Sequence, residues 1–277
     1  MTLLTRNNYF KGGIIFSAFS LCLVAAGGFF TFPVLSEAAA STAERSGGVI
    51  LSIVANFTSP SAYVPFWTML AAAIYSLVAL ILIYHFFEKT RSPEILFIGF
   101  FVVSLAFEPV RIVIPLRVSF VFSNLYLVGA TRVLLFGRYF GLLSLFVASV
   151  YAAGLDAQKQ QNIFLMLAIA ATVFAANIPV DSLAWDSSFK LLSGYRLMFD
   201  MVELGVLGIT VLTFLVTAFN RGSRGYIFIG IGVFMLFAGR NILLRSDTWL
   251  IPIMGLALLA AGTWLVCSRL HKEYLWL

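Results

Sequence analysis

Long apolar runs separated by short polar turns follow one another along the whole chain. A helix needs about 20 apolar residues to cross a membrane, and eight runs are long enough. They extend over Gly13 to Phe32, Val64 to Phe87, Glu94 to Leu116, Val118 to Gly154, Ile163 to Val180, Tyr195 to Phe219, Tyr226 to Leu244 and Trp249 to Cys267. This pattern predicts an all-α, polytopic membrane helix bundle with eight spans.

Two of these runs are irregular. Pro109 lies near the end of the third run and, inside a helix, a proline releases backbone hydrogen bonds. We therefore expect a kink there, with Glu108 and Arg111 forming a local pair three residues apart. The fourth run would rise about 55 Å as one helix, which is too long for an upright span. It is either strongly tilted or partly re-entrant from Val118 to Ala130.

The N-terminal segment has two interpretations. Arg6 and Lys11 precede the first apolar run, and Ala38-x-Ala40 follows it, as in a cleavable signal peptide. The run is longer than the usual signal-peptide core, so we favour a retained first span. The predicted organisation is an N-terminal span or signal peptide at 1–35, an exported loop at 36–62, a seven-helix membrane core at 63–268 and a short cytoplasmic tail at 269–277.

Composition excludes several classes of protein. Hydrophobic residues make up 61% of the chain and charged residues 11%, which is far from the balance of a soluble domain. The net charge of +6 does not indicate nucleic-acid binding, because the basic residues lie mainly in loops. Cys22 and Cys267 are far apart, and His85 and His271 are the only histidines. No metal site or cofactor is predicted.

The distribution of basic residues predicts the orientation. Nine lysines and arginines fall on one side of the eight-span layout and four on the other, so the positive-inside rule places both termini in the cytoplasm if the first span is retained. The predicted location is the cytoplasmic (inner) membrane. The inner set is Arg6, Lys11, Lys89, Arg91, Lys159, Arg221, Arg224, Arg269 and Lys272, and the outer set is Arg45, Arg117, Lys190 and Arg245.

The remaining five arginines lie within spans together with three acids, and ionisable residues at such positions usually face protein or a watery cavity. On a helix, Arg196, Asp200 and Glu203 project from one stripe. Five bases against three acids would suit an outward-facing cavity for an anionic ligand, such as a carboxylate or phosphate. Headgroup-level snorkelling and helix-to-helix ties are the alternative. The candidate residues are Glu108, Arg111, Arg132, Arg138, Arg196, Asp200, Glu203 and Arg240.

Arg138 is the deepest of these bases. If its helix begins near Asn124, Arg138 lies about 20 Å along it, too far for an easy reach to the interface. We therefore predict that Arg138 pairs with Asp200 or Glu203. Gly137 and Gly141 would let another helix approach closely beside it. For Arg132, snorkelling to the exported interface is the alternative to a place in the cavity.

Two stretches resemble the membrane core of the bacterial seven-transmembrane receptors with diverse intracellular signalling modules. They are the hairpin from Tyr84 to Phe100 and the basic turn before Tyr226 to Gly230. The resemblance covers Val64 to Cys267 and implies an outside start and an inside finish. The chain departs from that family in having neither a folded exported sensor domain nor a cytoplasmic output domain, so a signal would pass to a separate partner. No functional residue is carried over from the family.

Enzymatic motifs are missing from the sequence. There is no Gly-x-Ser-x-Gly elbow, His-Glu-x-x-His, P-loop or dinucleotide fingerprint. Catalytic residues are therefore not predicted, and an enzyme is the less favoured class. A receptor-like sensing or signalling-partner module remains, with a small transporter or permease subunit for an anionic or zwitterionic solute as the alternative. The expected partners are membrane lipid, an anionic small molecule and a separate signalling or transport protein.

Overall fold

The computed structural model of the protein describes residues 3–40, 63–88, 90, 92–120, 123–156, 160–186, 188–189, 191–245 and 248–275. Within these residues, eight helical segments are long and apolar enough to cross a membrane. The predicted all-α, eight-span membrane bundle is therefore confirmed. The elements are α1 (Leu3–Ala40), α3 (Val64–Phe87), α4 (Pro93–Leu105), η2 (Glu108–Ile112), α5 (Val113–Ser119), α6 (Asn124–Ala152), α7 (Gln160–Asn177), β1 (Val180–Trp185), β2 (Leu191–Ser193), α8 (Arg196–Arg221), α9 (Gly225–Arg245) and α10 (Leu250–Leu275).

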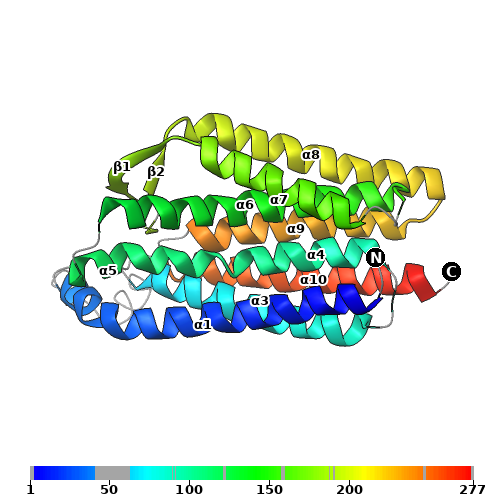
Figure 1. The fold of residues 1–277 in the computed structure, drawn as a ribbon. Helices are drawn as coiled ribbons and strands as arrows, with labels where there is room; N and C mark the ends of the chain where they lie inside the picture. Colours follow the sequence, from blue (N-terminus) through cyan, green and yellow to red (C-terminus); the bar gives the residue numbers. More distant parts are fainter. Residues whose placement is uncertain are drawn as a thin grey trace, which may run out of the picture.

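The long helices lie roughly side by side, and both chain ends lie at the same end of the bundle (Figure 1). We call this end the terminal end. At the opposite end, β1 and β2 form an antiparallel hairpin between α7 and α8, and we call it the hairpin end. Figure 1 shows α7 and α8 along one side and α1 and α3 along the other, with α4, α6 and α9 between them. Most of α4 is buried, so α4 forms the centre of the core.

The third span is broken as predicted. Helix α4 ends at Leu105, a 3-10 turn runs from Glu108 to Ile112, and α5 then continues to Ser119. Pro109 has no backbone N–H, so it cannot continue the α-helical hydrogen bonding from the preceding turn. The 3-10 turn carries Glu108 and Arg111 into the protein interior, where both side chains are buried.

The re-entrant interpretation of Val118 to Ala130 is wrong. Phe120 is extended, and α6 begins at Asn124 and continues without interruption through Ala130. The Ser123 hydroxyl accepts a hydrogen bond from the backbone N–H of Leu125, which satisfies one free donor at the start of the helix. At 29 residues, α6 rises about 44 Å and extends beyond a hydrocarbon core of about 30 Å.

Buried serines tie α1 into the bundle. The hydroxyls of Ser17 and Ser76 lie 2.9 Å apart, and Ser76 donates to the carbonyl oxygen of Val102 in α4. Ser20 donates to the carbonyl oxygen of Ala106 at 2.6 Å. Hydroxyl bonds of this kind hold helices together where there is no water to compete. Cleavage or retention of the first span stays a prediction, and α1 has the contacts of a structural helix.

Much of the predicted exported loop 36–62 lies outside the described residues, because α1 extends to Ala40 and 41–62 are not described. At the other end, α10 extends to Leu275, past the predicted end of the eighth span. The orientation count also includes residues outside the described part, namely Arg45, Lys89, Arg91, Lys159 and Lys190.

Four glycines bring α9 and α10 into backbone contact. Gly232 and Gly239 are seven residues apart on α9, and Gly255 and Gly262 are seven apart on α10. A Cβ atom on Gly239 would lie 2.9 Å from the carbonyl oxygen of Gly255, and one on Gly262 would lie 2.9 Å from the carbonyl oxygen of Gly232. Small residues at such spacing let two membrane helices approach closely, so dispersion contacts between the backbones hold the pair together.

We expect Gly239→Ala and Gly255→Ala each to destabilise the protein by about 1–3 kcal/mol, because the added methyl group meets backbone that cannot move aside. Alanine is the better helix former, so a loss of stability can come only from the helix contact. The measurement is thermal unfolding in detergent. Gly208→Ala is the control, since its Cβ would have no atom within 4 Å. Equal unfolding temperatures for all three variants would contradict the assignment.

Candidate functional site

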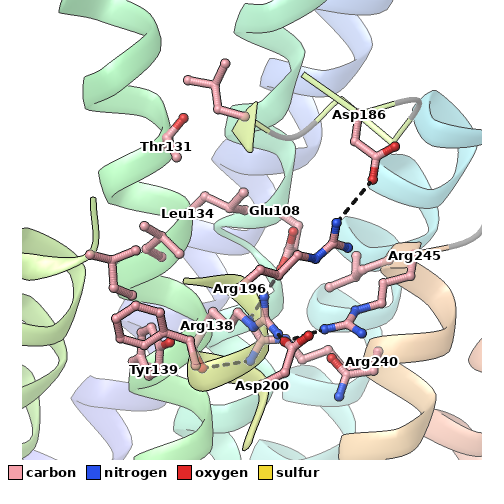
Figure 2. A pocket seen from close by; sticks show the side chains of 16 residues that line it. Glu108, Thr131, Leu134, Arg138, Tyr139, Asp186, Arg196, Asp200, Arg240 and Arg245 are labelled. Carbon is pink, nitrogen blue, oxygen red and sulfur yellow. Dashed lines mark hydrogen bonds and ion pairs between the residues drawn. The ribbon is translucent and has the colours of Figure 1, made fainter. Parts of the chain in front are cut away.

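A polar recess lies near the hairpin end, where η2, α6, α8 and α9 meet (Figure 2). Its free space is about 70 Å³. One water needs roughly 10–15 Å³ of such space, so the recess can hold several waters or one small anionic group. Charged and polar side chains from all four elements point toward it, including Glu108, Arg138, Arg196, Asp200, Arg240 and Arg245.

Arg138 pairs with both acids of α8, which confirms the predicted contact. Its Nε lies 2.6 Å from Glu203 Oε1, and its Nη2 donates to Glu203 Oε2 at 2.7 Å. The two parallel contacts form the fork geometry that makes arginine–carboxylate pairs strong. A third contact, at 3.2 Å, joins Nη2 to Asp200 Oδ1. Arg138 therefore ties α6 to α8 through Glu203, with Asp200 as a weaker additional partner.

A second set of pairs lies deeper in the bundle and centres on Glu108. Its carboxylate lies 3.1 Å from Arg111 Nη2 and 3.3 Å from Arg240 Nη2. Arg111 also donates to the carbonyl oxygens of Ser188 and Leu244, which connects the 3-10 turn to the hairpin region and to α9. These side chains are almost completely buried, so each charge needs its partner to offset the loss of hydration.

Arg240 links the two sets of pairs. Its Nη1 donates to the backbone carbonyl oxygen of Arg138 at 3.0 Å, while its Nη2 contacts Glu108. A glycine at position 141 makes room for this side chain, because a Cβ there would lie 2.9 Å from Arg240 Nη1. At Gly137, a Cβ would lie 2.6 Å from Phe107 Cβ, so both glycines allow the close approach to α6 that the sequence predicted.

The rim of the recess contains pairs that sequence reasoning missed. Arg245 Nη2 lies 2.7 Å from Asp200 Oδ1, although the sequence pattern places Arg245 in the outer set of loop residues. Arg196 is turned toward Asp186, at 3.9 Å, rather than toward Asp200 on its own helix (Figure 2). A charge at the end of a span gives no sequence signal of which way it points, so neither pair could have been found from the sequence pattern alone.

Arg132 lies outside the recess. Its guanidinium donates to the carbonyl oxygens of Ala175 and Ile178, at the C-terminal end of α7. The last carbonyls of a helix have no partner within the helix, and their partial negative charge favours a cation. The structure therefore places seven of the eight predicted residues in or beside the recess and sets Arg132 apart as a cap on α7.

Among the described side chains, the ion pairs of the recess have a surplus of one positive charge. Arg111, Arg138, Arg240 and Arg245 pair with three described carboxylates, those of Glu108, Asp200 and Glu203. The Arg196–Asp186 pair at the rim adds no net charge. An excess guanidinium in a partly dry site attracts an anion, because the attraction is weakly screened there.

An apolar layer lies next to the charges of the recess on the side of the terminal end. Leu142, Leu207 and Phe237 form a buried cluster. Leu142 and Leu207 are four residues after Arg138 and Glu203, on helices that run away from the hairpin end. Phe237 is three residues before Arg240 on α9, which runs in the opposite direction. Each apolar residue thus lies one helical turn below a charged one.

Among the described residues, no group of three or more His, Cys, Asp or Glu side chains is arranged to hold a metal ion. The groups that line the recess are mainly guanidinium and carboxylate groups, together with the hydroxyls of Thr131 and Tyr139 and the amide of Asn241. Comparisons with protein-family models, with curated proteins and with solved structures give no match to the chain. Its function has to be inferred from the recess itself.

We predict that Arg138→Met destabilises the protein by about 3–5 kcal/mol, because it leaves a buried carboxylate without a cation. Glu203→Gln in the same chain should restore much of that loss, whereas Asp200→Asn should restore less. The Glu203 side chain is 4% exposed and makes two contacts with Arg138. The Asp200 side chain is 30% exposed and keeps a second cation, Arg245, when Arg138 is removed.

The measurement is a pair of double-mutant cycles on unfolding in lipid or detergent. Arg224→Met, at the exposed turn of the terminal end, is the control and should have little effect. Strict additivity in both cycles would show that the contacts of Arg138 contribute nothing to stability.

Proposed function

We propose that the protein is a receptor-like membrane module that binds a small anionic ligand in the recess. The observation that carries this proposal is the surplus of positive charge among the described residues of the recess, together with the buried apolar layer beneath it. A ligand can reach the charges from the hairpin end, while Leu142, Leu207 and Phe237 block a path to the other end. Binding without passage is what a sensing module requires. The resemblance of the hairpin and basic-turn sequences to seven-transmembrane receptors supports the same class.

The ligand group should be a carboxylate or a phosphate. Guanidinium groups match the planar or tetrahedral oxygens of these anions with two parallel hydrogen bonds. The free space of about 70 Å³ limits what enters to a small anion or to the acidic group of a larger molecule. Arg245 and Arg196 are the bases most accessible to such a group, with side chains 42% and 53% exposed.

Transport of an anionic solute is the second candidate function. The break in the third span supports it, because broken helices with polar groups at the break are typical of substrate sites in transporters. In a transporter, the apolar layer beneath Arg138 and Glu203 would have to open during the cycle. The two functions therefore differ in whether the bound anion ever crosses this layer.

We propose that the hairpin end faces the exported side. The described basic residues at the terminal end include Lys11, Arg221, Arg224, Arg269 and Lys272, which the positive-inside rule assigns to the cytoplasm. In this orientation the recess opens outward in the inner membrane, and both chain ends lie inside.

Single cysteines introduced at Ser223 and at Asn124, with Cys22 and Cys267 replaced by serine, should react with an impermeant maleimide from opposite sides of the membrane. Ser223 lies in the turn between α8 and α9, and Asn124 is exposed at the start of α6. Labelling in intact cells should modify Asn124→Cys alone. Modification of both variants, or of Ser223→Cys alone, would reject the proposed orientation.

Binding and passage can be separated with the purified protein. In nanodiscs, a titration with acetate, succinate and phosphate should show saturable binding of at least one anion, and Arg245→Gln should weaken it about tenfold, which corresponds to the loss of one charged hydrogen bond. Arg224→Gln is the matched control at the terminal end and should bind like the wild type.

The same radiolabelled anion is then tested for uptake into proteoliposomes. Binding without uptake above that of empty vesicles supports the receptor-like function. Uptake that Arg245→Gln abolishes would reject it in favour of transport. No binding of any of the three anions to the wild type would remove the ligand class proposed for the recess.

A further inference from the structure

A long apolar groove runs along the bundle on the face formed by α6 and α7, separate from the polar recess. One part lies against α1 and has about 490 Å³ of free space, with Tyr9, Gly12 and Phe164 among its lining residues. A second part has about 460 Å³ and is lined by Arg132 and Thr172 among others. Phe107 and Phe136 line both parts, so the two parts adjoin at these two rings.

Successive helical turns form the walls of this groove. On α6 the lining residues Arg132, Phe136 and Phe140 are four apart, and on α7 Phe164, Ala168, Thr172 and Ala176 are four apart. The groove therefore follows the helix axes, and its α6 wall alone rises about 12 Å. Its walls are almost entirely apolar, with aromatic rings in contact along it, such as the Phe107–Phe136 pair at 5.5 Å. Space of this shape fits a hydrocarbon chain.

Arg132 places one positive charge in this apolar groove. Its guanidinium donates to two carbonyl oxygens of the α7 terminus, but it has no carboxylate within ion-pair distance among the described residues. The other four arginines predicted within spans each contact an acid. A cation that remains without an anion at membrane depth is costly, so a negatively charged group from outside the chain is favoured beside Arg132.

The depth of Arg132 suits a lipid headgroup. Helix α6 rises about 44 Å, and if it is centred on a hydrocarbon core of about 30 Å, each end extends about 7 Å beyond the core. Arg132 is eight residues after Asn124, about 12 Å along the helix, and so lies about 5 Å inside the hydrocarbon boundary. An arginine side chain spans that distance, which brings the guanidinium to the layer of lipid phosphates.

We propose that this groove binds an anionic glycerophospholipid, with its phosphate at Arg132 and one acyl chain along the aromatic wall toward α1. A molecule with one anionic head and a long apolar tail matches a groove with one cation near one end and apolar walls beyond it. Gly12 leaves that wall open, since a Cβ there would have no atom within 4 Å. The proposal is independent of the ligand proposed for the recess.

The test is native mass spectrometry of the full chain, titrated with phosphatidylglycerol and phosphatidylcholine of identical acyl chains. The wild type should retain one phosphatidylglycerol with about fivefold preference over phosphatidylcholine, the selectivity expected of one arginine near the headgroups (about 1 kcal/mol). Arg132→Lys should keep the preference, and Arg132→Gln should abolish it. Gly12→Leu should reduce retention of both lipids, whereas Gly208→Leu on α8 should match the wild type, because its Cβ also has no atom within 4 Å.

Arg132 also caps α7, so its variants are compared at equal folded fraction, measured by thermal unfolding in lipid-free detergent. Glutamine still carries a donor for the α7 carbonyls, and a loss of stability alone does not change the ratio of the two lipids. If Arg132→Gln does not fold, the Gly12→Leu and Gly208→Leu pair still tests the groove.

Three results of the lipid titration, repeated with oleate added, would overturn the proposal. They are an unchanged phosphatidylglycerol preference in Arg132→Gln, unchanged lipid retention in Gly12→Leu, and retention of oleate in place of phosphatidylglycerol, which would identify a fatty acid as the occupant. A wild-type dimer that the Gly12→Leu substitution dissociates would also reject the proposal, because the groove would then hold a second copy of the chain.

Discussion

The fork contact between Arg138 and Glu203 is the interaction on which the hairpin end of the bundle depends. It holds a guanidinium and a carboxylate at membrane depth, where neither could remain charged and unpaired without a large loss of stability. The backbone carbonyl of Arg138 binds Arg240, and Arg240 in turn shares Glu108 with Arg111. One pair thus positions a chain of charges that crosses from α8 through α6 and α9 to the 3-10 turn.

The charged side chains of the recess lie directly above an apolar layer, and this contrast limits the chemistry at the hairpin end. Leu142, Leu207 and Phe237 are one turn from the charges and contain no polar group, so this layer offers water no hydrogen-bonding partner from its side chains. A charged recess above an apolar layer is an arrangement suited to recognising an ion from one side of a membrane. It also concentrates the electrostatic attraction at the rim, where Arg245 and Arg196 are accessible.

Much of this arrangement was predictable because the membrane limits the choices. Apolar length alone locates the eight spans, and the depth of Arg138 leaves Asp200 and Glu203 as its best partners. Contacts that depend on packing could not be predicted in the same way. The partner of Arg132 is the carbonyl end of α7, and a backbone oxygen has no signature in the sequence. The sequence pattern places Arg245 in a loop because the apolar run ends at Leu244, but helix α9 continues one residue further and includes Arg245. Asp186 becomes a partner of Arg196 only through the hairpin.

The glycine contacts of α9 and α10 have a mechanical consequence. Where two backbones touch at Gly239 and Gly255 and again at Gly232 and Gly262, neither helix can slide or rotate against the other without a steric clash. The two helices are therefore packed as one rigid pair. Arg240 and Arg245 are at one end of this pair, and Glu273, which accepts a hydrogen bond from Ser223, is at the other. If the arginines at one end were displaced, this close packing would carry the movement toward the Ser223–Glu273 end of the pair.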